Sequence, residues 1–145
     1  MHWKRNDLLY NESEVMHMRR IIAAAIVKGE KILIAKRSYG SLADYWEFPG
    51  GKVEDNESDE SCLKREIMEE LKVNLKMEKF LGEQRFCVED KEYIMALYKA
   101  ALLDDNFQLS VHREIAWVEK GQILKYKLAP VDELLVHQGC LEELE

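Results

Sequence analysis

The chain has 145 residues, of which 47% are hydrophobic and 34% are charged, so it can form the core of one globular domain. Its formal net charge of −7 and its pI near 5.2 argue against nonspecific binding to a nucleic-acid polymer or to an anionic membrane surface. If the substrate is an anion, the chain must therefore recruit a cation to bind it.

Residues 1–18 have mixed polarity and are treated as a leader of unknown role. An ordered arm, a flexible leader and a cloning remnant all remain open for this segment. Residues 19–145 contain no internal repeat, no low-complexity tract and no linker rich in proline and serine. We therefore expect residues 19–145 to form a single domain.

The first predicted elements are two strands within residues 19–37, which meet at a turn over residues 28–30. Residues 46–49 predict a short strand. A helix is expected to follow, with Asn56 or Ser58 as its N-cap. Acidic residues in its first turn suit the positive end of the helix dipole, and the helix should run to about Leu71.

The second half of the chain predicts two longer strands, over residues 73–88 and 92–103, and a shorter strand over residues 114–119. A closing helix is expected over residues 130–138, with Pro130 in its first turn. Strands and helices are mixed but do not alternate as in a doubly wound fold. The sequence therefore predicts an α/β domain of another kind.

The helix that ends near Leu71 carries three glutamates beside its apolar stripe. At about 100° per residue, the glutamates occupy an arc of roughly 100° that adjoins the stripe. The stripe consists of Leu63, Ile67 and Leu71, and the arc consists of Glu66, Glu69 and Glu70. Arg65 lies one turn before Glu69 and can hold it. On spacing alone, a solvated charged face is the more common explanation of such an arc.

A second interpretation of the three glutamates is possible when the glycines before the helix are included. Gly51 is followed after five residues by Glu57, and after seven more by residues 65–73, REIMEELKV. This arrangement resembles the Nudix box, Gly-x5-Glu-x7-Arg-Glu-U-x-Glu-Glu-x-Gly-U, where U is an aliphatic residue. Only the final glycine is missing, and Lys72 stands in its place. The segments WEFPGGK and LAPVDE resemble the MutT-like branch, especially its cytidine-triphosphate pyrophosphohydrolases, so the resemblance covers roughly residues 19–138.

The resemblance implies an α/β/α sandwich around a mixed β-sheet and an enzyme that hydrolyses a nucleoside diphosphate linked to another group. It also implies a site for Mg²⁺ or Mn²⁺ in the box. The metal ligands implied by the motif are the carboxylates of Glu66, Glu69 and Glu70 and the carbonyl of Gly50. Glu57 and Arg65 would orient these carboxylates.

The chemistry of the residues agrees with this assignment, because hard divalent cations prefer oxygen ligands and often bind carboxylates and phosphates together. The expected reaction is attack of an activated water on a nucleoside triphosphate, which gives a monophosphate and pyrophosphate. Glu66, Glu69 and Glu114 all remain candidates for the general base. Many relatives carry a glutamate where this chain has Val111, which weakens the case for Glu114.

Four residues outside the helix are candidates for substrate binding. Arg37 and Lys52 could contact phosphate, although a surface charge or a structural salt bridge is about as common for each. Phe48 could stack on a base, but both it and Trp46 are more often core residues. Asp132 could accept a hydrogen bond from the cytosine amine, which favours CTP, dCTP or modified cytosine nucleotides, or it could only charge the first turn of the closing helix.

The remaining reactive side chains give no competing site. The three cysteines, Cys62, Cys87 and Cys140, form no CxxC pair, and the four histidines share no ligand spacing, so we treat them as incidental. The longest apolar run, residues 21–27, is far shorter than the roughly 20 residues that span a bilayer, and no secretory signal is recognisable. We expect a cytoplasmic protein without membrane contact.

Two other functions stay open. A Nudix-like domain can serve as a nucleotide-sensing module without catalysis, although such modules usually lose box carboxylates and this chain keeps them. A Nudix enzyme can also act on an oxidised purine triphosphate such as 8-oxo-dGTP, on a dinucleoside polyphosphate or on a nucleotide sugar, because the box contacts only the diphosphate and the metal. The oligomeric state, monomer or homodimer, is also open.

Overall fold

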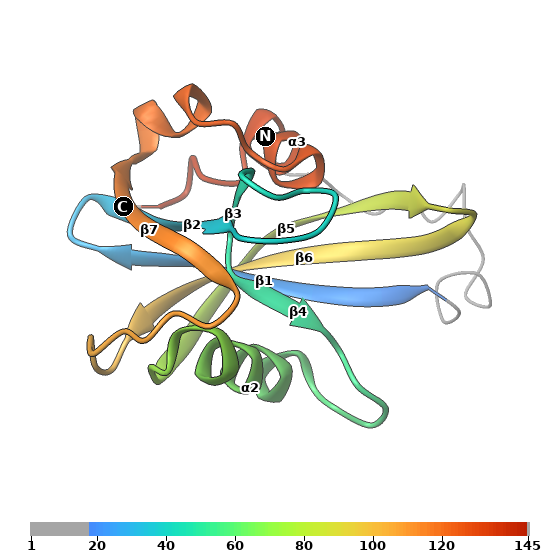
Figure 1. Cartoon of the computed structure of the whole chain (residues 1–145), viewed down its shortest axis with the longest axis horizontal. Coiled ribbons are helices and arrows are strands. Elements are labelled where there is room, and N and C mark those ends of the chain that lie inside the picture. The colour runs from blue at the N-terminus through green and yellow to red at the C-terminus, as the bar shows by residue number, and fades with distance from the viewer. Residues whose placement is uncertain (1–17, 145) are drawn as a thin grey trace.

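The computed structural model describes residues 18–144, so the predicted leader lies outside the described residues except for Met18. The chain folds into one sheet with helices on both faces (Figure 1). The strands are β1 (Arg19–Lys28), β2 (Lys31–Arg37), β3 (Trp46–Glu47), β4 (Gly50–Lys52), β5 (Leu75–Val88), β6 (Lys91–Leu102) and β7 (His112–Glu119). The helices are α2 (Asp59–Leu71), the 3-10 helix η1 (Lys120–Lys125) and α3 (Pro130–His137).

The sheet of the described residues is mixed. Its strand order is β3-β2-β1-β6-β5, while β4 pairs with β1 and β7 pairs with β2. β1 and β6 run parallel, and the other pairs are antiparallel. Antiparallel neighbours can follow one another through tight turns, but the parallel pair needs a long crossover, which here contains β2, β3, β4, α2 and β5.

Two hydrophobic clusters fill the two sides of the sheet, because successive side chains of a strand point to opposite faces. On β1, Ile22 and Ala24 pack in the cluster that contains the apolar stripe of α2. Ala23 and Ala25 pack in the other cluster, which contains Leu135 of α3. Figure 1 shows α2 on one side of the sheet and α3 on the other. The expected α/β/α sandwich around a mixed sheet is therefore confirmed.

Most predicted elements are present with small shifts in their ends. The β1–β2 turn contains Gly29 at a φ of 64°, and α2 ends at Leu71. The strand predicted over residues 46–49 ends at Glu47, because the Phe48 amide donates to the Asp132 side chain and Pro49 has no amide hydrogen. Helix η1 was not predicted, and β7 begins at His112, two residues earlier than expected.

The two glycines before helix α2 lie in a short strand. In β4, Gly50 pairs with Ala23 and Gly51 with Ile22 of β1. Gly50 has no room for a side chain, because a Cβ there would clash with the Ile22 carbonyl oxygen and the Ala23 Cα. Close approach of two strands, and not an unusual backbone conformation, therefore explains this glycine.

No helix in the part of the chain that the structure describes is long and apolar enough to cross a bilayer.

Candidate active site

Helix α2 is fixed at both ends, which sets the positions of its carboxylates. Ser58 is the N-cap, and its Oγ accepts a hydrogen bond from the Ser61 amide at 3.1 Å. At the other end, Lys72 adopts the left-handed conformation, with φ 59° and ψ 34°, and its amide donates to the Met68 carbonyl. The buried stripe of α2 faces the sheet, so the three box glutamates project beside β4.

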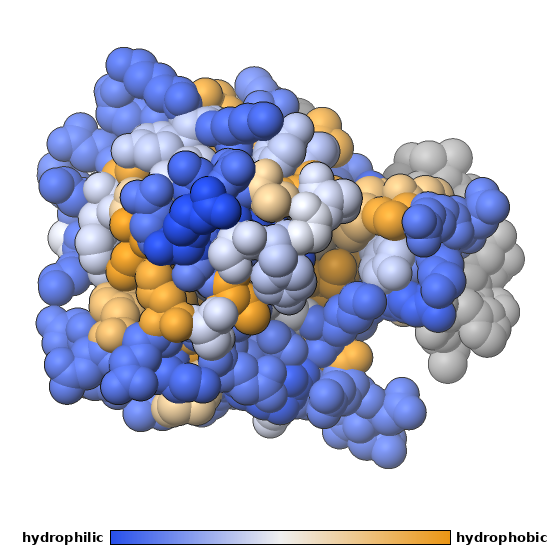
Figure 2. Space-filling model, in the orientation of Figure 1, coloured by the Kyte–Doolittle hydropathy of each residue, from blue (hydrophilic) through white to orange (hydrophobic). Residues whose placement is uncertain are grey.

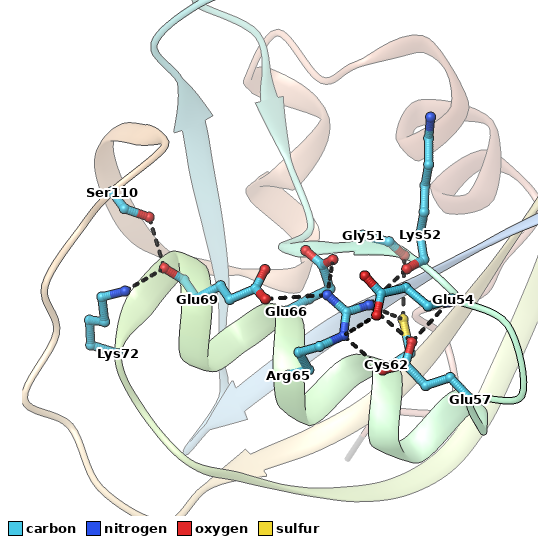
Figure 3. Close-up of polar contacts among 10 residues, drawn as sticks. All are labelled: Gly51, Lys52, Glu54, Glu57, Cys62, Arg65, Glu66, Glu69, Lys72 and Ser110. Atoms are coloured by element: carbon cyan, nitrogen blue, oxygen red, sulfur yellow. Dashed lines mark hydrogen bonds and ion pairs between the residues drawn. The ribbon is translucent and has the colours of Figure 1, made fainter.

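Arg65 lies at the centre of the polar contacts of the site (Figure 3). Its guanidinium forms a bidentate pair with Glu57, with Nε 2.7 Å from Oε2 and Nη2 2.9 Å from Oε1. Its Nη1 lies 2.8 Å from Glu66 Oε1 and 3.4 Å from Glu69 Oε1, and its Nη2 donates to the Lys52 carbonyl. Planar bidentate pairs of this kind fix orientation as well as charge. In this arrangement Arg65 holds Glu66 and Glu69, while Glu57 holds Arg65.

The charges of the site are unevenly compensated. Hydrogen bonds from Arg65 lower the pKa of Glu57 to about 2, and the bonds with Glu57 in turn raise the pKa of Arg65. Burial raises the pKa of Glu66. Burial, together with the nearby carboxylates of Glu47 and Glu66, raises the pKa of Glu70 to about 8. The site therefore contains more buried carboxylates than its own cations neutralise.

Gly51 makes room for one of these carboxylates. A Cβ built on Gly51 would overlap the carboxyl group of Glu66, so only glycine allows Glu66 its present position. Glu70 lies against the other glycine, and its Oε1 accepts a hydrogen bond from the Gly50 amide at 3.3 Å. Strand β4 thus positions two of the three box glutamates through its backbone.

These residues fit a divalent cation by the chemistry of their donors, since the three glutamates offer carboxyl oxygen atoms. Within residues 18–144, however, no three His, Cys, Asp or Glu side chains gather closely enough to hold a metal ion. Glu66 and Glu69 are held by Arg65, and Glu70 is held by Gly50. Joint coordination by the three glutamates would require their side chains to move together.

A cavity of about 460 Å³ joins the box glutamates to an apolar region on the α3 side of the sheet. It is lined by all the residues predicted as metal ligands and all those predicted for substrate binding. These are Gly50, Glu66, Glu69 and Glu70, and Arg37, Phe48, Lys52 and Asp132. Its apolar part includes Met95 and Val131, and Figure 2 shows hydrophobic surface on one face of the molecule between hydrophilic borders. The cavity therefore has one acidic end and one apolar end.

A partly buried chain of polar contacts beside the cavity was not predicted. Arg37 Nη1 donates to Glu47 Oε1 at 3.3 Å, and His112 Nε2 lies 2.9 Å from Glu47 Oε2. The His112 side chain is fully buried, and its contact with Glu47 was not expected from the sequence. Glu47 directly precedes the candidate residue Phe48 in the sequence, and this position was the only sequence feature that could have pointed to Glu47. The contact with His112 depends on the pairing of β2 with β7, which the sequence does not reveal.

Phe48 and Asp132 are joined at the apolar end. Phe48 is only 2% exposed and belongs to the core cluster on the α3 side. Its amide donates to Asp132 Oδ2 at 2.8 Å. Asp132 is 4% exposed and lies in the first turn of α3. Burial, with a smaller contribution from Glu47, raises the pKa of Asp132 to about 8.

The other candidates lie less close to the chemistry. Figure 3 shows the Lys52 side chain pointing away from the glutamates, and its Nζ lies 5.5 Å from the centre of the Tyr93 ring. Trp46 packs edge-to-face on Tyr126. Glu114 Oε1 lies 3.6 Å from Lys36 Nζ, and Glu114 is not among the described residues that line the cavity. This position argues against Glu114 as the general base.

Comparisons with known proteins find similarity along most of this chain. The NUDIX domain matches residues 17–139. CTP pyrophosphohydrolase of Escherichia coli K12 is 31% identical over 118 residues, covering 81% of this chain and 87% of that protein. An 8-oxo-dGTP diphosphatase of Proteus vulgaris is 44% identical over 57 residues, covering 37% of this chain and 51% of that protein. A MutT NUDIX hydrolase structure from Burkholderia pseudomallei superposes with a TM-score of 0.73 at 26% identity, covering 83% and 96% of the two chains.

Proposed function

The chain belongs to the NUDIX domain family, on its MutT-like side, and is a Nudix hydrolase, and from this premise we propose that it is a nucleoside triphosphate pyrophosphohydrolase. Its products would be a nucleoside monophosphate and pyrophosphate. Residues 19–145 would act as a single catalytic domain in the cytoplasm. We propose Mg²⁺ or Mn²⁺ as the cofactor, because Nudix hydrolases generally need a divalent metal ion.

The observation that carries this proposal is the cavity with two unlike ends. Its acidic end brings together Glu66, Glu69 and Glu70, where metal-bound phosphates would lie. Its apolar end has Phe48 and Asp132 in the wall, where a base would lie. A nucleoside triphosphate has the same division between a charged chain and a largely apolar ring.

Each residue at the acidic end has a distinct part in this proposal. Glu66, Glu69 and Glu70 would hold the cation, which supplies activation of water and neutralisation of charge on the leaving phosphate. Arg65 and Glu57 set the orientation of Glu66 and Glu69 before substrate binds. Arg37 presents a guanidinium to the cavity, where it can pair with a phosphate oxygen. Glu66 and Glu69 remain the two candidates for the general base.

For the base we propose cytosine, in CTP, dCTP or a modified cytosine nucleotide. The E. coli relative, a CTP pyrophosphohydrolase that matches 81% of this chain, supports this choice. Asp132 supports it less than the sequence suggested. With its pKa raised to about 8, Asp132 is largely protonated near pH 7, so it can donate as well as accept a hydrogen bond, as an asparagine does.

Oxidised guanine is the second candidate base. The P. vulgaris relative is an 8-oxo-dGTP diphosphatase and is 44% identical over the shorter segment that it shares with this chain. A protonated Asp132 would suit this substrate as well. Pyrophosphate release should therefore be measured on the four common ribonucleotides and deoxyribonucleotides and on 8-oxo-dGTP, each with Mg²⁺.

We predict that turnover needs the cation and the box glutamates. Glu69→Gln and Glu70→Gln should each lose most activity, because an amide is a poorer ligand for a hard cation than a carboxylate. Glu60→Gln is the matched control, since Glu60 lies on the same helix but pairs with Lys64 at the exposed surface. Kinetics of pyrophosphate release give the comparison. Full turnover in excess chelator, or equal losses in all three variants, would contradict the proposed mechanism.

A further inference from the structure

The loop between β2 and β3 lies at the cavity and is anchored on both sides. The Ser38 amide and hydroxyl both donate to the Val111 carbonyl, at 3.3 Å and 2.9 Å. Arg37 and Asp44 are joined by the hydrogen bond from the Asp44 amide to the Arg37 carbonyl at 2.9 Å. An ion pair connects Asp44 with Arg113 of β7. Both ends of the loop are therefore fixed by these contacts. The residues between them are held beside the cavity.

Tyr39 is the aromatic residue that this loop presents to the cavity. Its side chain lines the cavity, yet Tyr39 is 57% exposed. A single exposed aromatic residue is common on protein surfaces and needs no explanation by itself. Tyr39 differs because its ring centre lies 5.7 Å from the guanidinium carbon of Arg37, which is itself a cavity residue. The Tyr39 ring therefore packs on Arg37, and Arg37 in turn donates a hydrogen bond to Glu47.

A base bound in the cavity would need an accessible aromatic ring face, which the other aromatic residue of the cavity lining does not provide. Phe48 also lines the cavity, but it is 2% exposed and packs in the core. A planar base gains most from an accessible ring face, since stacking requires area on both partners. Tyr39 has that area, and the anchored loop keeps it beside the cavity.

We propose that Tyr39 is the stacking surface for the nucleobase of the substrate, and so determines how tightly nucleotides bind. This inference rests on the proposed function and adds a residue to its binding site. Every base has a π-face, so stacking on Tyr39 adds affinity for all bases. Discrimination among bases is then left to the hydrogen-bonding groups deeper in the cavity, such as Asp132.

The test compares Tyr39→Ala with Tyr39→Phe in steady-state kinetics with CTP and Mg²⁺. Tyr39→Ala should raise KM by roughly 5- to 150-fold with a smaller effect on kcat, the range that corresponds to losing one base stack. Tyr39→Phe keeps the ring and should behave like the parent. Phe80→Ala is a further control, because Phe80 is 44% exposed but packs on Tyr98 outside the cavity.

Inorganic tripolyphosphate separates a base contact from a phosphate contact. It has no base, so its inhibition constant should be the same for the parent and for Tyr39→Ala. An equal loss of tripolyphosphate binding would overturn the proposal, and so would a KM within twofold of the parent for Tyr39→Ala. If no nucleotide is hydrolysed by the parent, the proposed function fails. Calorimetric binding of CMP to the same variants then tests Tyr39 separately, and equal affinities would overturn the stacking role.

Discussion

Gly50 and Gly51 show how closely the backbone approaches its neighbours beside the carboxylates. A side chain at Gly50 would meet the backbone of β1, which cannot move without breaking strand pairing. A side chain at Gly51 would meet the end of the Glu66 side chain, which can rotate away. The two positions therefore need glycine for different reasons, one for the fold and one for the site.

We predict opposite consequences for alanine at these two glycines. Gly50→Ala should lower the free energy of unfolding by about 2 kcal/mol or more, as overpacking against backbone does. Gly51→Ala should fold with nearly the parent melting temperature but displace Glu66, and a displacement of about 1 Å can cost about 100-fold in turnover. Thermal melts and kinetics on both variants check this. A Gly51→Ala enzyme with full activity would show that the position of Glu66 does not matter.

At the residue scale, the position of the three box glutamates at one cavity could be predicted, because their spacing is local in sequence. Glu57 and Arg65 were expected to act together, and the structure shows them in a bidentate pair. The contact between Glu47 and His112 could not be predicted in the same way. It depends on strand pairing over a long sequence separation, and the β2–β7 register shifts between Lys36 and Arg37, next to this contact.

At the scale of elements, the C-terminus of α2 is strained but well bonded. Lys72 has a positive φ, which glycine adopts without strain but which costs a residue with a Cβ about 1 kcal/mol. Its Nζ donates to the Glu69 carbonyl at 2.9 Å, and Ser110 Oγ donates to the same carbonyl (Figure 3). These bonds satisfy carbonyl groups that a helix end leaves free. The helix thus ends where the box pattern normally places its last glycine.

We predict that Lys72→Gly stabilises the protein slightly. Removing the strained Cβ should gain about 1 kcal/mol, less a few tenths for the exposed hydrogen bond of the lysine side chain. Lys72→Ala is the control, because it keeps the strain and loses the bond, so it should be no more stable than the parent. Denaturant unfolding of the three proteins measures the difference. A Lys72→Gly protein less stable than Lys72→Ala would mean that backbone strain is not what glycine relieves here.

Other elements show where local patterns stop being informative. The hairpin of β1 and β2, helix α2 and helix α3 were predicted because each has its own turn or cap signals. Strand β4 was missed, since two glycines predict a turn and a three-residue strand exists only through its pairing with β1. The 3-10 helix η1 was missed because its six residues have no periodic pattern of their own.

At the scale of the whole molecule, the parallel pairing of β1 with β6 builds the site. It joins Arg19–Ile26 to Tyr93–Ala100, segments about seventy residues apart in the sequence. β1 also pairs with β4, and its residues line the cavity between the carboxylates of α2 and Asp132 of α3. Strand periodicity could indicate each segment, but the choice of partner is nonlocal. The same assembly places Asp132 in the interior, where its ionisation affects global stability.

The ionisation of Asp132 makes the stability of the protein depend on pH. Asp132 has an ordinary pKa of 3.8, which is raised to about 8 in the folded protein. Burial is the largest cause and Glu47 adds to it, while the hydrogen bond from the Phe48 amide and the charge of Arg37 lower the pKa. Between these two values the folded state keeps a proton that the unfolded state has lost, so the free energy of unfolding falls as pH rises through this range. Asp132→Asn removes this contribution while its amide oxygen can still accept from Phe48.

Relative to the parent, Asp132→Asn should therefore gain stability steadily from about pH 4 to about pH 8 and then level off, because the parent loses its proton there. Denaturant unfolding of both proteins across this range, in a chelating buffer so that cations do not offset the carboxylates, measures the difference. Comparing the two proteins cancels Glu57, whose lowered pKa works in the opposite direction by adding stability that is lost as pH falls toward 2. A difference that stays constant across the range would mean that Asp132 is already ionised in the folded protein, and Asp132 would then favour cytosine as an acceptor after all.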